Sequence, residues 1–187
     1  MYNLKIFKGK KVIITGHTGF KGSWLALWLH HLGANVLGIS NAYSTNPNHF
    51  KLLKPKLKIK SLSIDISNLN KLETVIKYYK PDFVFHLAAQ ALVGKSYLDP
   101  ITTFQSNTIG TLNLLQSLRK LKKKCTAIII TSDKSYKNLE INRGYREEDL
   151  LGGKDPYSAS KAAAEMILHC YSNIFFDKKS NIKISIA

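Results

Sequence analysis

A tyrosine and a lysine stand four residues apart in the segment DPYSASK (155–161), which has the composition of a helix start. If residues 157–161 are helical, Tyr157 and Lys161 lie on the same face of that helix. The charge of the lysine would then favour the phenolate and lower the pKa of the Tyr157 hydroxyl from its usual value of about 10. The pair could therefore act as a general base near neutral pH. Because YxxxK is only a two-residue pattern, an exposed chance pair is the alternative.

A second set of polar residues, Ser132, Asp133 and Lys134, follows the apolar segment CTAIIITS (125–132). If that segment is a parallel strand, the three side chains lie at the carboxyl edge of the sheet, where ligands bind in such folds. An acid and a base side by side suggest a proton-transfer step of their own. Each would need a shifted pKa, so the hypothesis includes burial of both groups by a substrate. An exposed Asp–Lys pair in a loop is the alternative.

The segment GHTGFKG (16–22) has the pattern GxxGxxG between a predicted strand and a predicted helix. In this context Gly16 would allow a tight turn, Gly19 a close approach of the backbone to a pyrophosphate, and Gly22 close packing of the helix on the strand. The helix start would also offer free N–H groups to phosphates. The motif predicts dinucleotide binding, and a purely structural glycine turn is the alternative.

Two further segments fit a dinucleotide site. Asp65, at the end of a predicted strand, could accept a hydrogen bond from an adenine amine while Ile66 packs on the ring; an ordinary helix-capping role for Asp65 is equally compatible. In HLAAQ (86–90), Ala88 and Ala89 would leave room for a cofactor to cross the strand end.

The choice between NAD and NADP stays open, with NAD favoured. NAD-selective sites often carry an acidic residue after the second strand, but GISNAYS (38–44) has no carboxylate. It also has no arginine for a 2′-phosphate, although Lys21 is close in sequence.

Strands and helices alternate along the chain. Apolar segments predict strands at 10–16, 35–40, 60–66, 82–89, 125–132 and 182–187. Amphipathic segments predict helices at 19–33, 67–79, 99–121 and 156–176, with a loop at 41–50. Two inner stripes are expected, formed by Trp24, Leu25, Trp28, Leu29 and Leu32, and by Ile101, Phe104, Thr108, Leu112 and Leu115. Ser67 or Asn68 should cap the second helix, Gly33 should close the first, and Pro156 should lie in the first turn of the last.

This alternation predicts an α/β fold with a doubly wound, Rossmann-like parallel sheet covered on both faces. Residues 1–187 are expected to form one dinucleotide-binding domain. Because the sequence ends inside the last predicted strand, we expect a chain truncated at its C-terminal end, with a C-terminal substrate domain missing.

Composition narrows the classes of protein. The 187 residues are 44% hydrophobic and carry a formal net charge of +16. Scattered lysines without base-stacking motifs favour a solvated surface, and attraction to an anionic small substrate, over nucleic-acid binding. No apolar run reaches the roughly 18 residues needed to cross a bilayer, and residues 1–16 do not form a signal peptide. Cys125 and Cys170 fit neither a disulfide framework nor a zinc site, which favours a reducing cytoplasm and no metal.

Four segments together resemble one enzyme family: GHTGFKGSWLALWL, HLAAQALV, TSDKSYKN and GYREEDLLGGKDPYSASKAAAE. They are similar to nucleotide-sugar 4,6-dehydratases of the extended short-chain dehydrogenase/reductase superfamily, above all to the branch that acts on CDP-glucose. The dTDP-glucose branch is less similar, because it has Thr-Asp-Glu where this chain has Ser132-Asp133-Lys134. The resemblance extends over essentially all 187 residues.

The resemblance implies an NAD-dependent lyase that converts CDP-glucose to CDP-4-keto-6-deoxyglucose for surface polysaccharide synthesis. Ser132 would hold the substrate hydroxyl and Tyr157 would remove its proton while a hydride leaves for the nicotinamide. Lys161 would bind the nicotinamide ribose, Lys134 would take the C5 proton, and Asp133 would protonate the departing 6-hydroxyl. The cofactor would contact Gly16, Thr18, Gly19, Phe20, Lys21, Gly22, Asp65, Ile66, Leu87, Ala88, Ala89, Gln90, Asn107, Tyr157 and Lys161. A homodimer or homotetramer is expected for the full-length protein.

Some features depart from the family pattern, and other functions stay open. Gly94 and Lys95 stand where an arginine near a substrate phosphate is expected, and Lys95 could replace it. The smaller C-terminal domain that clamps the nucleotide sugar in the family is not among these residues. The alternatives are an epimerase or reductase on the same scaffold, which would not need Asp133 and Lys134 in these roles, and an inactive NAD-binding fragment.

Overall fold

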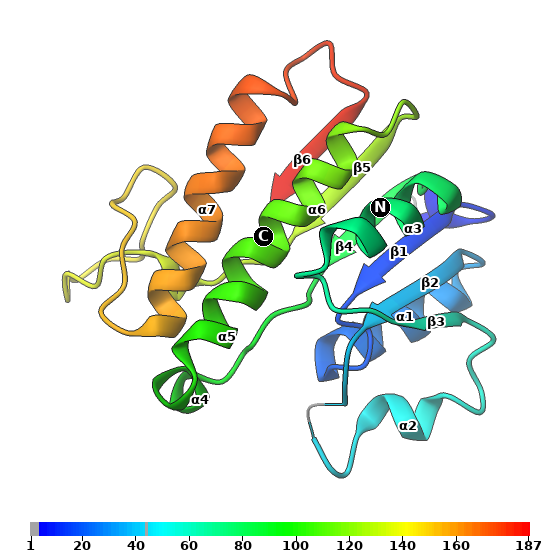
Figure 1. The fold of residues 1–187 in the computed structure, drawn as a ribbon, viewed down its shortest axis with the longest axis horizontal. Coiled ribbons are helices and arrows are strands. Elements are labelled where there is room, and N and C mark those ends of the chain that lie inside the picture. Colours follow the sequence, from blue (N-terminus) through cyan, green and yellow to red (C-terminus); the bar gives the residue numbers. More distant parts are fainter. Residues whose placement is uncertain (1–3, 44) are drawn as a thin grey trace.

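The computed structural model describes residues 4–43 and 45–187, in which strands and helices alternate (Figure 1). The strands are β1 (Lys11–Thr15), β2 (Asn35–Ser40), β3 (Lys60–Ser63), β4 (Phe83–His86), β5 (Cys125–Ile129) and β6 (Ile182–Ile186). The α-helices are α1 (Phe20–His31), α2 (His49–Leu53), α3 (Leu69–Tyr79), α4 (Val93–Leu98), α5 (Pro100–Phe104), α6 (Gly110–Arg119) and α7 (Pro156–Ile174). Shorter turns are the 3₁₀ helices η1 (Leu4–Phe7) and η3 (Asp133–Ser135) and the π-helical η2 (Gln105–Ile109). Ser44, in the predicted loop, and residues 1–3 lie outside the described part.

The six strands form one parallel sheet in the order β3-β2-β1-β4-β5-β6, which confirms the predicted fold class. The register aligns one row of residues across the sheet near its carboxyl edge: Leu62, Ile39, Thr15, His86, Ile129 and Ile186. The segments that follow this row therefore leave the sheet side by side. This alignment brings the glycine loop after β1, HLAAQ at the end of β4 and TSDK after β5 to one edge of the sheet.

Helices cover the two faces of the sheet unequally. The helices α3, α6 and α7 lie on one face (Figure 1). They bury leucines and isoleucines, among them Leu114, Leu118 and Leu168, against Ile13 and Ala127. On the other face α1 contributes Ala26 and Leu29 to a smaller cluster with Val12 and Ile14. Full burial of a leucine or isoleucine stabilises a fold by roughly 1.5–3 kcal/mol, so the larger cluster supplies most of the hydrophobic stabilisation. The edge strand β3 is exposed along its whole length, so the prediction of strands covered on both faces is wrong there.

The predicted inner stripe of the first helix is wrong for its aromatic members. Trp24 is 51% exposed and Trp28 is 54% exposed, while Gly22, Ser23, Ala26 and Leu29 are the buried residues. The helix starts so close to the glycine loop that a Cβ at Gly22 would lie 2.2 Å from the Gly16 carbonyl oxygen. Only small side chains fit at that separation, and the tryptophans therefore face outward.

The predicted helix at 99–121 is interrupted. Asp99 caps α5, and the π-helical turn η2 separates α5 from α6. A π turn holds more residues than an α turn and shifts the buried stripe, so Ile101 (70%) and Phe104 (38%) are exposed, contrary to the prediction. Of the expected inner residues, Thr108 and Leu115 are buried and Leu112 is half-buried.

Most expected termini are confirmed. Asn68 caps α3, Gly33 follows α1 with a φ of +80°, and Pro156 lies in the first turn of α7 behind a capping box formed by Asp155 and Ser158. Five strands end one to three residues earlier than predicted. The predicted loop at 41–50 runs into the start of α2, and α4 was not expected at all.

Candidate functional site

The glycine loop between β1 and α1 has the geometry that its spacing predicts. Gly16 has a φ of +75°, which L-residues with a side chain rarely adopt, and a Cβ there would lie 2.7 Å from the Ala88 nitrogen. Gly19 precedes α1 in extended conformation, and no side chain caps the helix. The first N–H groups of α1 are therefore left for an acceptor from outside the helix, as in sites that bind phosphates.

The side chains of the loop itself attach it to β2, β3 and the segment before α2. Thr18 donates from Oγ1 to the Ala42 carbonyl oxygen at 2.6 Å, and Asn48 donates to the Thr18 carbonyl oxygen at 3.0 Å. The fully buried His17 lies 2.7 Å from the hydroxyl of Ser61 and packs edge-on against Phe50. Phe20, by contrast, is 70% exposed. The backbone of this loop is thereby fixed on several sides.

Asp65 and Ile66 follow β3 and are held by two neighbouring elements. Asp65 accepts hydrogen bonds from Asn41 at 2.8 Å and from the Ser67 N–H at 2.8 Å. Burial opposes ionisation of this carboxyl, but these hydrogen bonds hold its pKa below the usual value. Ile66 is buried over Gly110 of α6, where a Cβ would lie 2.4 Å from the isoleucine side chain. Asp65 therefore stabilises the turn that precedes α3 through its hydrogen bond with Ser67. The N-cap residue of that helix is Asn68.

A buried polar network joins the carboxyl end of β4 to η2. The Thr111 hydroxyl donates to the Asn107 carbonyl oxygen at 2.7 Å, so it must accept from Nε2 of His86, 3.1 Å away. Nδ1 of His86 then accepts from Thr15 Oγ1 at 2.7 Å. Burial lowers the pKa of the His86 imidazole to about 3, and the charge of Lys161 adds to this effect. The histidine is therefore neutral, with one tautomer fixed by its neighbours.

Asn107 connects the HLAAQ segment to α7. Its Oδ1 accepts from the Gln90 N–H at 2.7 Å, and its Nδ2 donates to the Gln90 carbonyl oxygen at 3.1 Å and to Ser160 Oγ at 2.9 Å. The π-helical turn thus directs a buried amide to both elements. Leu87, Ala88, Ala89 and Gln90 are all half-buried at the sheet edge next to Gly16.

Ser132, Asp133 and Lys134 form a tight turn after β5. Ser132 precedes η3 and its Oγ accepts from the Lys134 N–H at 3.3 Å and donates to Asp133 Oδ1 at the same distance. Asp133 and Lys134 are both exposed, and Ser132 is half-buried. The alternative of an exposed Asp–Lys pair in a loop also predicts this exposure, and the proton-transfer role, which needs a bound substrate to shield the two charged groups, stays a prediction.

Tyr157 and Lys161 lie in the first turns of α7, as the spacing predicts. Tyr157 is 9% exposed and Lys161 is 7% exposed. The ammonium of Lys161 donates to the carbonyl oxygen of Ile130 at 3.2 Å, which joins α7 to the segment that leads to Ser132. Burial lowers the pKa of Lys161 to about 8; Glu165 opposes this change and Lys21 adds to it. The alternative of an exposed chance pair is therefore wrong.

The predicted site residues other than Asn107 lie in segments that follow the carboxyl ends of strands or in the first turns of α1 and α7, and Asn107 lies in η2. Sequence reasoning missed the polar residues that support them: Thr15, His86, Thr111, Asn113, Ser160 and Glu165. Asn113 donates to the Ile66 carbonyl oxygen at 3.0 Å, and Ser160 accepts from Asn107. Only Glu165 had a usable sequence signal, since it follows Lys161 by one further helical turn.

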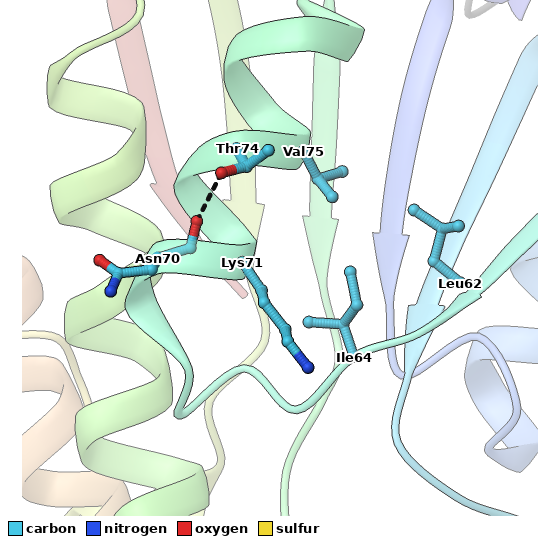
Figure 2. A pocket seen from close by; sticks show the side chains of 6 residues that line it. All are labelled: Leu62, Ile64, Asn70, Lys71, Thr74 and Val75. Carbon is cyan, nitrogen blue, oxygen red and sulfur yellow. Dashed lines mark hydrogen bonds between the residues drawn. The ribbon is translucent and has the colours of Figure 1, made fainter.

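A shallow apolar hollow of about 450 Å³ lies at the far edge of the sheet (Figure 2). It is lined by Leu62, Ile64, Asn70, Lys71, Thr74 and Val75, from β3, the loop after it and α3. None of these residues is a predicted site residue. The hollow is therefore separate from the candidate site formed by the polar residues described above.

Two searches of the described residues bear on other kinds of site. Across residues 4–43 and 45–187, no three His, Cys, Asp or Glu side chains are grouped so that they could hold a metal ion. Within the same residues, no helix combines the length and apolar character that a membrane span requires.

The sheet order, the glycine loop and the tyrosine–lysine helix define an extended short-chain dehydrogenase/reductase that resembles enzymes of nucleotide-sugar metabolism. Residues 13–181 match the family described as GDP-mannose 4,6 dehydratase, and the chain belongs to that family. The match includes the glycine loop, the Ser132–Lys134 turn, Tyr157 and Lys161.

The individual relatives include dehydratases as well as epimerases. A CDP-glucose 4,6-dehydratase of Salmonella typhimurium is 43% identical over 177 residues, which cover 95% of this chain and 49% of that protein. The structure of the epimerase Mth375 of Methanothermobacter thermautotrophicus aligns with a TM-score of 0.84 at 25% identity, over 98% of this chain and 52% of that one. The UDP-glucose 4-epimerase of Brucella ovis in complex with NAD has a TM-score of 0.76 at 26% identity, over 95% and 51%. The chain thus spans about half the length of these relatives.

Proposed function

We propose that residues 1–187 are the dinucleotide-binding domain of an NAD-dependent CDP-glucose 4,6-dehydratase, whose product is CDP-4-keto-6-deoxyglucose. One observation above all supports the proposal: Lys161 donates a hydrogen bond to the Ile130 carbonyl oxygen, two residues before the Ser132-Asp133-Lys134 turn. The identity of 43% to a CDP-glucose 4,6-dehydratase supports the substrate. An acid and a base next to the hydride-transfer residues fit a dehydration better than a simple oxidation.

The residues present fit a dinucleotide. The close approach at Gly16, the uncapped start of α1 and the half-buried Leu87–Gln90 segment would hold the pyrophosphate and adenosine. Asp65 and Ile66 would contact the adenine, and Lys161 the nicotinamide ribose, with Asn107, Thr18, Phe20 and Lys21 completing the site. The complex of the Brucella ovis relative with NAD supports this choice of cofactor. NADP stays the alternative, because Ser40, the last residue of β2, and Asn41 after it provide no carboxylate.

The chain's own residues then divide the proton transfers among them. When bound, NAD would accept a hydride from C4 of the sugar and later return it to C6. Ser132 would hold the 4-hydroxyl while Tyr157 takes its proton. The 4-keto group acidifies C5, so that Lys134 can remove the C5 proton and Asp133 can protonate the departing 6-hydroxyl. Because both groups are exposed, the bound sugar has to exclude water from them before these steps.

Product analysis tests this function. The protein is incubated with NAD and CDP-glucose in heavy water, and the sugar is examined by NMR and mass spectrometry. A 4-keto-6-deoxy sugar with one solvent deuteron at C5 is the expected product. Unchanged CDP-glucose, together with turnover of GDP-mannose or dTDP-glucose, would refute the substrate and keep the reaction class.

An epimerase is the second candidate, since a UDP-glucose 4-epimerase of Mycoplasma genitalium is 31% identical over 163 residues. Such an enzyme would use Ser132, Tyr157 and Lys161 and leave Asp133 and Lys134 without a chemical role. A C4 epimer among the products, with no loss of water, would favour it. The cytoplasmic location, the role in surface polysaccharide synthesis, the homodimer or homotetramer and the absence of nucleic-acid binding remain predictions of this proposal.

A further inference from the structure

Glu165 is a buried carboxylate that none of the proposed proton transfers uses. It lies on α7 with 6% exposure, and its Oε1 accepts a hydrogen bond from the Ser135 hydroxyl at 2.6 Å. Ser135 is fully buried in η3, the turn that also contains Asp133 and Lys134. Burial of a carboxylate without partners is costly, so the buried Glu165 requires interactions that compensate for the loss of water. The hydrogen bond from Ser135 is the first of these.

The second compensating interaction is with Lys161. Tyr157, Lys161 and Glu165 follow one another at four-residue intervals, so they share one face of α7. The carboxylate of Glu165 favours the charged form of Lys161, while burial and the charge of Lys21 from the glycine loop oppose it. Two uncharged groups also interact with the ammonium: the neutral His86 of β4 and the Ile130 carbonyl oxygen beyond β5. Glu165 is thus the one anion among the groups that act on Lys161 in the described residues.

We propose that Glu165 is a positioning residue that anchors the Ser132–Ser135 turn to α7 and keeps Lys161 charged beside Tyr157. The inference rests on the proposed function for its catalytic meaning. Its structural content does not depend on that function: one carboxylate accepts a hydrogen bond from the Ser132–Ser135 turn and acts on the charge of the lysine one helical turn away. The backbone reinforces the anchor, since Gly152 donates to the Ser135 carbonyl oxygen at 2.8 Å and so attaches the long loop before α7 to the same turn.

Two substitutions separate the hydrogen bond from the charge. Glu165→Gln keeps an acceptor for Ser135 and removes the negative charge, whereas Ser135→Ala removes the hydrogen bond and keeps the charge. Glu73→Gln is the matched control, because Glu73 pairs with Lys120 on the surface of α3, away from the site. The protonation of Lys161 is followed by NMR of the 187-residue chain with isotope-labelled lysine, which needs no turnover.

The expected result is a pKa of Lys161 at least half a unit lower in Glu165→Gln than in the parent chain, and unchanged in Ser135→Ala and Glu73→Gln. An unchanged value in Glu165→Gln would overturn the role of the charge. This readout is independent of the substrate, so a protein that turns over no nucleotide sugar would refute the proposed function and leave this result standing.

Turnover with CDP-glucose tests the hydrogen bond. Glu165→Ala and Ser135→Ala are each expected to lower kcat about tenfold with little change in KM, and the double variant should lose no more than the larger single loss. Fully multiplicative losses would overturn the anchor. The alkaline limb of the kcat profile, where Lys161 loses its proton, should move to lower pH in Glu165→Gln and stay in place in Ser135→Ala, a difference that a purely structural defect would not produce. Equal profiles in both variants would contradict the proposal.

Discussion

The ammonium of Lys161 donates a hydrogen bond to the carbonyl oxygen of Ile130, 3.2 Å away. The bond links the first turns of α7 to the chain two residues before Ser132. Burial of Lys161 at this position lowers the pKa of its ammonium to about 8. The bond therefore joins the segments proposed for hydride transfer and for dehydration at a place where burial of the lysine has a measurable electrostatic cost.

Substitution of Lys161 by methionine should make the free protein more stable at pH 7. A folded pKa of about 8 against 10.5 when unfolded means that the unfolded chain binds more protons between these values. The parent's free energy of unfolding should therefore rise by about 3 kcal/mol between pH 8 and 10.5. Lys161→Met has no ammonium to bury, so at pH 7 its free energy of unfolding should exceed that of the parent by most of this amount. Urea unfolding at pH 7 and pH 10 measures both. Lys77→Met, at an exposed position of α3, is the control and should change stability little.

Alanine at Gly16 should cost at least 2 kcal/mol of stability and abolish NAD binding. The φ of +75° is unfavourable for alanine, and the new Cβ would lie 2.7 Å from the Ala88 backbone nitrogen. Gly94→Ala is the matched control, because a Cβ there meets nothing within 4 Å and α4 is helical at that position. That control should bind NAD normally and gain up to about 1 kcal/mol. Calorimetry measures NAD binding and urea unfolding measures stability. A Gly16→Ala variant that bound NAD like the parent would contradict the proposed site.

Acid should destabilise the fold through His86. Its pKa is about 3 in the folded protein and near 6.5 when unfolded, so the unfolded chain binds more protons in this window. As the pH falls from 6.5 towards 3, this group should remove up to about 5 kcal/mol of stability. His86→Asn should lose stability at pH 7, because the bonds to Thr15 and Thr111 are disturbed, and should show a flatter dependence between pH 6.5 and 4. An equally steep loss in both proteins would assign the acid sensitivity to other groups.

Much of the fold and of the candidate site could be predicted from the sequence, because hydrophobic periodicity and glycine spacing act locally. The alternation of strands and helices, the turn at Gly16 and the shared face of Tyr157 and Lys161 all depend on such signals. The errors have physical causes beyond the local pattern. Trp24 and Trp28 look like core residues until the close contact at Gly22 excludes large side chains. Asn107 reaches its partners through a π turn that an α-helical repeat does not predict.

Substitution of the two proposed bases, Tyr157 and Lys134, should separate the oxidation step from the dehydration step. Tyr157→Phe should lower hydride transfer by roughly 10²–10⁴-fold, because no group then takes the hydroxyl proton. Lys134→Ala should still oxidise CDP-glucose in part but fail to release water, so that reduced cofactor accumulates and absorbs in the near ultraviolet. Stopped-flow absorbance follows this step. Loss of water at the parent rate in Lys134→Ala would show that another residue removes the C5 proton.

The most direct test of the proposed function follows one hydrogen atom. CDP-glucose that carries deuterium at C4 is given to the protein with unlabelled NAD, and the product is examined by NMR. The account predicts that the deuterium moves to the C6 methyl group of a 4-keto sugar. Deuterium that stays at C4, in an epimer or in unchanged substrate, would contradict it.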